Sequence, residues 1–227
     1  FPPGGSADLL ARMVSQKLSV ALNQTIVVEN RTGAGGTIAA SAVAKANPDG
    51  YTLFLGSAAT QSIAPAVYKN LSYQSPQAFQ PITMVAQIPV ALVVNPGVKA
   101  NTVQELLTLA KNQKDPLTYA SSGTGAIPHL AGELFQQSTG IKLTHIPYKG
   151  APLAMTDLIS GRVDMMFDNL PTVLPNIRGG KLRALAIAGS KQTRALPNVP
   201  TLAELGIRGA EVTSWFGVFA PTGLPQP

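Results

Sequence analysis

Short apolar segments alternate with helix-like segments along most of the chain, and this alternation constrains the fold more than any other feature of the sequence. The apolar segments show little polar alternation, which is typical of strands buried on both faces of a sheet. Alternating strands and helices form sheets covered by helices. We therefore predict an α/β protein, with mostly parallel sheets flanked by helices.

Hydrophobic periodicity and Gly, Pro and Asn turn signals place the individual elements. Strands are expected over residues 25–30, 51–55, 79–94 (interrupted at Pro89), 117–120, 142–147, 163–167, 182–188 and 215–220. Helices are expected over residues 6–22, 37–46, 102–112, 152–160, 170–177 and 201–205, with a short one ending near Tyr68 and another ending near Ser138. The sequence Asn95-Pro96-Gly97 ends the long strand and is a candidate hinge between two lobes.

The charge pattern argues against a nucleic-acid partner. Charged residues make up only 12% of the chain, against about 25% in an average domain. The 17 basic and 11 acidic residues give a net charge of +6, but the basic residues are scattered and form no aromatic-rich basic strand. A mild positive field of this kind favours small anions instead.

Several classes of chemistry are absent from the sequence. The chain has no cysteine, which excludes disulfides, thiolate catalysis and zinc–sulfur sites. His129 and His145 lack further ligands at metal-binding spacing, so we expect no metal and no cofactor. We expect His145, on a strand, to be structural or at the surface. No apolar run reaches the ~18 residues of a membrane span.

The catalytic motifs are incomplete as well. Gly-x-Ser-x-Gly is absent, the loop at 33–36 lacks the third glycine of a dinucleotide fingerprint, and the loop at 123–125 lacks the lysine of a P-loop. Ser122 lies close to His129 in sequence, but a histidine that opens a helix is better suited to a cap or the wall of a cleft. We therefore predict a protein that is not an enzyme, and a carboxylate-processing enzyme that uses Ser122 or His129 is the weaker alternative.

Three loops rich in Gly, Ser and Thr carry the strongest binding signal: residues 3–6, 56–60 and 121–125. In the first loop, two glycines allow a turn, Ser6 is the expected helix N-cap, and Asp8 falls in the first turn. N–H groups at a helix N-terminus bind carboxylates and phosphates. An ordinary glycine turn before a capped helix is the alternative explanation for this loop alone.

Two further residues have both a structural and a functional interpretation. Asp168 ends a predicted buried strand and either caps the next helix or accepts a hydrogen bond from a ligand's ammonium or hydroxyl group. Tyr148 follows another strand and either lines a cleft or packs on the surface.

Together these motifs resemble one family, the Bug-type periplasmic solute-binding receptors of tripartite tricarboxylate (TctC-like) transporters. The matching motifs are Phe-Pro-Pro-Gly-Gly-Ser-Ala-Asp at 1–8, Val-Glu-Asn-Arg-Thr-Gly-Ala-Gly-Gly at 28–36, Pro-Asp-Gly-Tyr-Thr-Leu at 48–53, Ser-Ser-Gly-Thr-Gly-Ala at 121–126, Pro-His-Leu-Ala-Gly-Glu at 128–133, Pro-Tyr-Lys-Gly at 147–150, Gly-Arg-Val-Asp at 161–164 and Leu-Arg-Ala-Leu-Ala at 182–186. The resemblance covers essentially the whole chain.

The resemblance implies a type II periplasmic-binding-protein clamshell (a Venus flytrap) with the ligand in the cleft between two lobes. Lobe 1 would contain residues 1–96 and 218–227, and lobe 2 residues 97–217. Asp168 would hold the ammonium group in relatives that take amino acids. The expected ligand-binding residues are Pro3, Gly4, Gly5, Ser6, Ser57, Thr60, Ser122, Gly123, Thr124, His129, Tyr148 and Asp168.

The function implied is that of a monomeric periplasmic receptor, without catalysis, that delivers a small organic carboxylate to a membrane transporter. A ligand sensor for a signalling partner is an alternative. A ligand-sensing domain of a transcription regulator is weaker, because no helix-turn-helix segment is evident. Members of the family have a strand ahead of the position of Phe1 and continue beyond that of Pro227, so we expect this sequence to be part of a longer protein.

Overall fold

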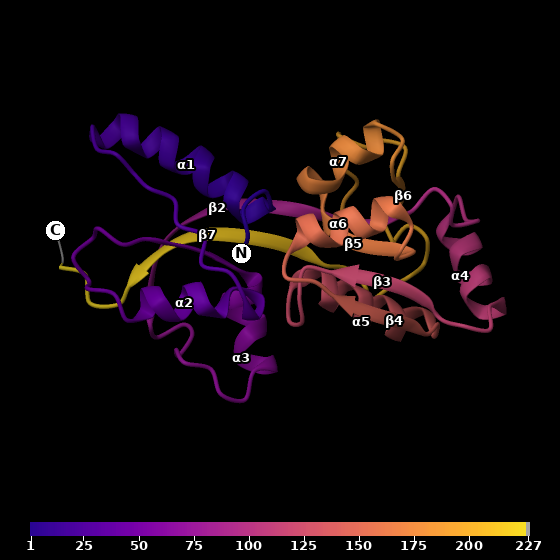
Figure 1. Cartoon of the computed structure of the whole chain (residues 1–227), viewed down its shortest axis with the longest axis horizontal. Helices are drawn as coiled ribbons and strands as arrows, with labels where there is room; N and C mark the ends of the chain where they lie inside the picture. Colours follow the sequence, from indigo (N-terminus) through magenta and orange to yellow (C-terminus); the bar gives the residue numbers. More distant parts are fainter. Residues whose placement is uncertain (226–227) are drawn as a thin grey trace. The chain divides into compact units, whose positions relative to one another are not determined.

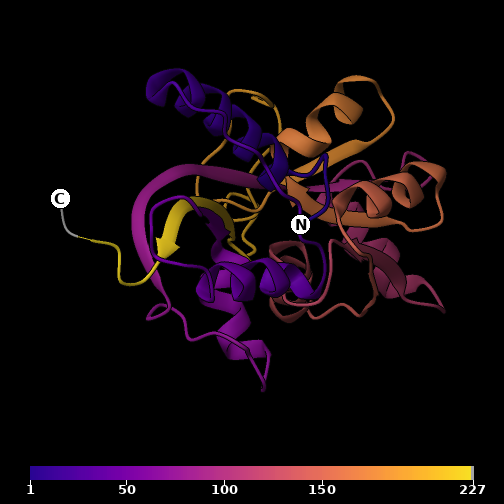
Figure 2. The same ribbon diagram turned by 60° about the vertical axis from the view of Figure 1, so that its left-hand side comes forward.

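The computed structural model describes residues 1–225, which form two compact units. Unit 1 comprises Phe1–Gln87 and the segment from Trp215 onward, and unit 2 comprises Ile88–Ser214 (Figure 1). The chain passes between the units within two long strands, β2 (Phe79–Val94) and β7 (Thr213–Pro221). Figure 2 shows β2 as a strongly curved strand.

Unit 1 begins with the longest helix of the described chain. Its other elements are a 3₁₀ turn, two short helices, a π-helical turn and a short strand, in addition to its parts of β2 and β7. These are α1 (Ser6–Leu22), the 3₁₀ turn Ala34–Gly36, α2 (Thr37–Ala44), β1 (Phe54–Ser57), the π turn Ala59–Ile63 and α3 (Ala64–Val67).

Unit 2 alternates helices and strands, as the sequence predicts. Its elements after β2 are α4 (Val103–Asn112), β3 (Leu117–Ser121), α5 (Ile127–Thr139), β4 (Leu143–Pro147), α6 (Ala151–Ser160), β5 (Met165–Asn169), α7 (Leu170–Arg178) and β6 (Arg183–Ile187). The start of α4 shows how a local sequence signal determines where a helix begins. Thr102 is its N-cap, and the Thr102 hydroxyl accepts the Glu105 N–H at 3.1 Å, as a capping threonine should.

The predicted α/β class with flanking helices is confirmed, but the sheets are mixed rather than mostly parallel. In unit 2, β3 lies between β4 and β5 and is parallel to both, as helical crossovers require. In contrast, β2 is antiparallel to β5 and β6, and in unit 1 β1 is antiparallel to β7. The antiparallel pairs involve β2 and β7, the strands that pass between the units.

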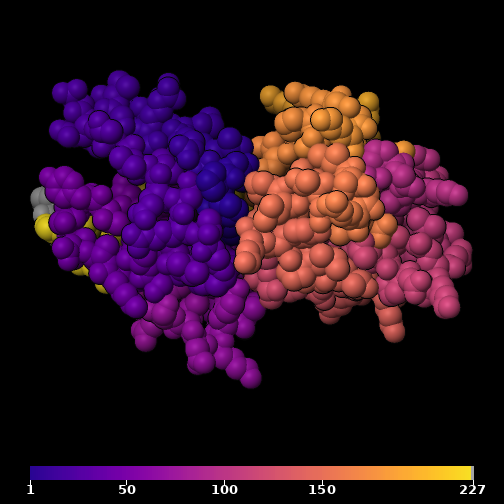
Figure 3. Space-filling view, in the orientation of Figure 1, coloured from indigo at the N-terminus to yellow at the C-terminus, as the bar shows by residue number. Residues whose placement is uncertain are grey.

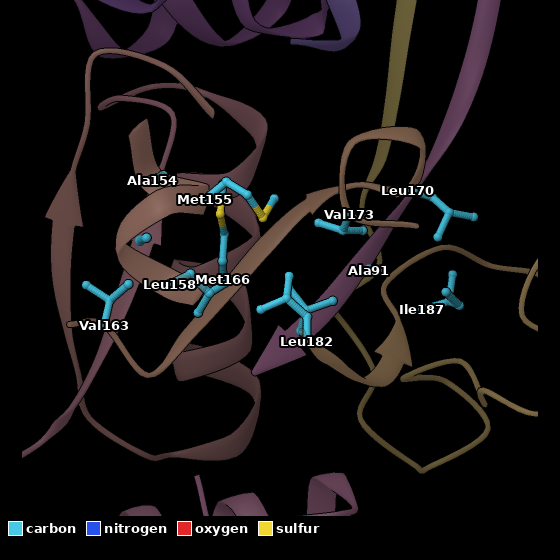
Figure 4. Packing of buried hydrophobic residues seen from close by; sticks show 12 residues of the cluster. Ala91, Ala154, Met155, Leu158, Val163, Met166, Leu170, Val173, Leu182 and Ile187 are labelled. Atoms are coloured by element: carbon cyan, nitrogen blue, oxygen red, sulfur yellow. The ribbon is translucent and has the colours of Figure 1, made fainter. Parts of the chain in front are cut away.

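Helices cover both faces of the unit 2 sheet. On one face, Leu158 and Met155 of α6 point toward Met166 of β5 in a cluster that also includes Val173 of α7 (Figure 4). On the other face, Phe135 of α5 packs on Phe167 of β5 with ring centroids 5.5 Å apart. Because neighbouring strand residues point to opposite faces, Asp168 lies on the α6–α7 side of the sheet and not on the α5 side.

Unit 1 has a smaller core. Phe54, Tyr73 and Phe79 are buried together, and Phe79 stacks on Phe54 with ring centroids 5.5 Å apart. Most of α1 lies on the surface, where its spheres are indigo in Figure 3; only Ser6 and Asp8 of this helix are buried.

Three local predictions were wrong. Residues 25–30 form no strand, because no neighbouring strand pairs with them and alternate residues are exposed. Residues 201–205 form a turn instead of a helix, because Thr201 makes an isolated parallel bridge to Ile187. Pro89 does not interrupt β2: the register of β2 with β5 begins at the next residue, Val90, so the missing N–H of Pro89 costs no bond in that ladder.

Candidate functional site

The loop before α1 is held in place by the helix's own first turn. The Asp8 carboxylate accepts the N–H of Gly4 at 3.0 Å and the Nε–H of Arg12 at 3.0 Å. The bond from Arg12, with that from Gly4, holds the pKa of Asp8 below its usual value against the effect of desolvation. Gly4 has φ = 83°, a conformation that strongly favours glycine.

Ser6 is not the N-cap that the sequence predicts. The cap is Gly5, and Ser6 is the first residue of α1. No side chain caps the first N–H groups of α1, and the Asp8 carboxylate reaches back instead to the N–H of Gly4 in the loop. The buried Ser6 Oγ has no hydrogen-bond partner within the protein.

A second loop lies beside the first within unit 1. A Cβ on Gly36 would lie 2.9 Å from both the Phe1 ring and the Thr60 methyl group, so the two loops meet at this glycine. Thr60 Oγ1 accepts the Ser57 N–H at 3.1 Å and closes a tight turn at the end of β1. Ser57 Oγ is buried and also lacks a partner. Because buried hydroxyls are nearly always paired, Ser6 and Ser57 are two donors available to a ligand.

In unit 2, a third loop leaves the carboxyl end of β3. The Tyr148 N–H, just after β4, donates to the Ser121 carbonyl at 3.0 Å, so the ends of the two parallel strands stay together. Gly123 has φ = 130°, and a Cβ there would lie 3.4 Å from the Tyr148 carbonyl oxygen. Ser122 and Gly123 are half-buried and Thr124 is exposed.

A group of aromatic and polar side chains supports this third loop from the α5 side of the sheet. Ser121 Oγ lies 2.6 Å from His145 Nε2 and accepts the Gly123 N–H at 3.2 Å. His129 Nδ1 accepts the Gly125 N–H at 3.2 Å. The sequence prediction missed Ser121 and gave His145 no part in the site, because their contact depends on the β3–β4 register. The sequence signal that could have indicated a role for Ser121 is strand alternation, which puts Tyr119 and Ser121 on the same face of their strand.

Asp168 is buried at the end of β5, the third strand whose carboxyl end lies at this edge. Thr172 Oγ1 donates to its Oδ2 at 2.8 Å. Burial raises the pKa of Asp168 to about 6, and the bond from Thr172 opposes the shift. The N-cap of α7 is Asn169, so the predicted capping role of Asp168 was wrong. The buried Asn169 Oδ1 has no partner.

Tyr148 is anchored to α6. Its hydroxyl donates to Asp157 Oδ2 at 2.8 Å, and its pKa is raised by burial and by that bond. The ring is partly buried against the hydrophobic cluster of unit 2, which agrees with the packing interpretation of this residue.

The donor set suits anion binding by neutral groups. The fully buried Ser121 hydroxyl is not placed to attack a substrate, although it is next to a histidine. Within residues 1–225, no three His, Asp or Glu side chains cluster as metal ligands. None of the helices in that range is long and apolar enough to cross a membrane.

Comparison with known proteins shows the family of this chain. Residues 10–227 match the family described as "Tripartite tricarboxylate transporter family receptor". The chain is 41% identical to the protein BugT of Bordetella pertussis over 224 residues, which cover 98% of this chain and 69% of BugT. Two solved structures from Rhodopseudomonas palustris superpose closely: Rpa4515 with adipate (TM-score 0.96, 38% identity, 100% of this chain and 76% of that one) and MatC with bound malate (TM-score 0.93, 34% identity, 99% and 76%).

The fold and the neutral donor loops define a solute-binding protein of the periplasmic-binding-protein class. The chain belongs to the tripartite tricarboxylate transporter receptor family. The resemblance on which the sequence prediction rests is therefore confirmed.

Proposed function

We propose that this protein is the periplasmic receptor of a tripartite tricarboxylate-type transporter and that it binds a small organic carboxylate. The observation that carries this proposal is the pair of buried, unpartnered hydroxyls, Ser6 Oγ and Ser57 Oγ, at the N-terminus of α1 and the end of β1. Such hydroxyls, together with the first N–H groups of a helix, donate to a carboxylate. The adipate and malate bound by the two R. palustris relatives support this ligand class.

The proposed ligand-binding residues remain those expected from the sequence. Lobe 1 (1–96 with 218–227) supplies the α1 loop and the end of β1, and lobe 2 (97–217) supplies the loop after β3 and the end of β5. A ligand held by both loops would stabilise a closed form, which the membrane subunits then recognise. The residues are Pro3, Gly4, Gly5, Ser6, Ser57, Thr60, Ser122, Gly123, Thr124, His129, Tyr148 and Asp168.

A thermal-shift panel on the full-length, refolded protein tests the proposal. Adipate and malate are compared with their diamides, which keep the shape but not the charge. At about 100 Kd a ligand adds about 2.7 kcal/mol of stability, or roughly 5–10 °C in Tm. Ser122→Ala should reduce the shift, whereas Ser138→Ala, on the exposed end of α5, should not. Equal shifts with acids and diamides would contradict carboxylate recognition.

The proposal also makes the protein a monomeric receptor and not an enzyme. Incubation of the pure protein with each bound acid, followed by NMR of the solution, should show no change in the acid. Conversion of the acid to product would overturn this part of the proposal, and Ser122→Ala would then show whether that serine is responsible.

A further inference from the structure

Three rings from three different elements form a column behind the loop at 121–125. Tyr119 of β3 stacks on His145 of β4 with centroids 4.8 Å apart, and His145 stacks on His129 of α5 at 4.3 Å. The parallel register places Tyr119 opposite His145, which aligns the first two rings. Figure 1 shows the three elements packed together in unit 2. Tyr119 is completely buried and donates to Glu133 Oε1 at 2.5 Å, so the outer end of the column is fixed.

His129 bonds a backbone N–H of the loop directly, and His145 is linked to another through the Ser121 hydroxyl. His145 contacts Ser121 Oγ, and this oxygen accepts the Gly123 N–H. His129 accepts the Gly125 N–H directly through Nδ1. Between these two fixed glycines lies Thr124, and Ser122 lies just before them. These restraints determine where the loop's remaining hydroxyl and N–H groups point.

We infer that His129 and His145 are positioning residues that hold the 121–125 loop in its ligand-binding conformation, and that His129 does so as a hydrogen-bond acceptor at Nδ1. The inference rests on the proposed function for the loop's role, but the restraint itself is a property of unit 2. A histidine accepts a hydrogen bond only at a nitrogen without a proton. His129 is therefore the tautomer with the proton on Nε2, which lies 3.9 Å from Glu133 Oε1.

His145 is held neutral by its surroundings. Burial, and then the neighbouring His129, lower the pKa of His145 to about 4, although Glu133 acts in the opposite direction. A neutral His145 either accepts the Ser121 hydroxyl proton at Nε2, or donates to Ser121 Oγ there while the hydroxyl donates to the Gly123 carbonyl at 3.3 Å. The titratable groups around His129 are Glu133 on its own helix, His145 on β4 and Tyr119 on β3. Asp168 lies on the opposite face of the sheet.

Paired substitutions separate hydrogen bonding from packing. His145→Phe keeps a ring in the column but removes the nitrogen that bonds Ser121 Oγ, whereas His145→Gln keeps a hydrogen-bonding group near the Nε2 position. Likewise, His129→Asn keeps an acceptor near the Nδ1 position, and His129→Leu removes it. Gln137→Ala, on the exposed face of α5, is the matched control.

The readout is amide hydrogen exchange of Gly123 and Gly125, measured by NMR on the ligand-free full-length protein, with Leu106 of α4 as an internal reference. His145→Phe should speed Gly123 exchange, and His129→Leu should speed Gly125 exchange, each about five- to ten-fold, with Leu106 unchanged. The Gln and Asn variants should restore most of the protection.

Two results would overturn the inference. One is unchanged exchange of Gly123 and Gly125 in the Phe and Leu variants. The other is that the Gln and Asn variants lose as much protection as the Phe and Leu variants, which would mean that the rings act only through packing. Adipate and malate titrations then test the link to binding. Loosened loops with weaker acid binding support the inference and the proposed function together. Loosened loops in a protein that binds neither acid would support the positioning role and count against the proposed function.

Discussion

Gly132 of α5 packs so closely on the Tyr119 ring that an added methyl group should be costly. An alanine Cβ at this position would lie 2.3 Å from Tyr119 Cε2 and 2.7 Å from Cζ. Ordinary contact begins near 3.4 Å, so the ring or the helix must move by about 1 Å. The ring has little room to move, because it is fully buried, stacked on His145 and bonded to Glu133.

Two opposing effects decide whether Gly132→Ala raises or lowers the free energy of unfolding. Alanine in a helix interior gains about 1 kcal/mol over glycine, and overpacking a rigid core costs about 1–3 kcal/mol. Because the atoms in conflict belong to a fixed ring, we expect the upper part of that range. The net loss in the free energy of unfolding should be about 1–2 kcal/mol.

A double-mutant cycle measured by urea denaturation isolates the clash. Tyr119→Leu removes the ring atoms that alanine would meet, so Gly132→Ala in that background should be neutral or stabilising by up to about 1 kcal/mol. The coupling between the two positions should therefore be about 2 kcal/mol. If Gly132→Ala stabilises both backgrounds equally, the close packing of α5 on Tyr119 is refuted.

Three further predictions concern single groups. The pKa of Asp168 is raised from 3.8 to about 6, so the folded state binds a proton more tightly than the unfolded state, and the free energy of unfolding should fall as pH rises from about 4 to 6. Asp168→Asn should remove this pH dependence in urea denaturation, and the same dependence in wild type and variant would refute the shift. Ser57→Ala removes an unpartnered buried hydroxyl, so ligand-free stability should stay the same or rise by up to about 1 kcal/mol while acid affinity falls; a loss of ligand-free stability would mean that this hydroxyl is already bonded. Thr102→Ala removes the cap of α4 and should lower the free energy of unfolding by about 1 kcal/mol in chemical denaturation, whereas Thr102→Ser should keep most of the wild-type stability.

Local signals in the sequence predict much of the fold. Thr102, followed by an amphipathic run, predicts α4 to within one residue of its observed start. The strand prediction for the apolar segment 25–30 was wrong because a strand forms only beside a neighbouring strand, and none pairs with this segment within residues 1–225. The mixed sheets could not be foreseen either, because local periodicity carries no information on which strands pair.

In the candidate site too, the sequence predicts the features that local residue types determine and misses those that depend on strand pairing. Gly4, Gly123 and the Ser and Thr residues around them are visible as loop motifs, since positive φ favours glycine and short hydroxyl side chains supply hydrogen-bond donors. The role of His145 was missed because it depends on the parallel register that sets it opposite Tyr119 and close to Ser121. The shift of the N-cap from Ser6 to Gly5, and the bond from Gly4 to Asp8, depend on backbone and side-chain geometry that the spacing of residues does not determine.

Calorimetric titration of the refolded full-length protein with adipate, malate and their diamides tests the central claim most directly. We predict saturable binding of at least one acid with one site per chain, no binding of its diamide, and a loss of affinity of about ten-fold or more in Ser6→Ala. Equal binding of acid and diamide, or full affinity in Ser6→Ala, would contradict a carboxylate site built from the hydroxyl and N–H groups at the start of α1.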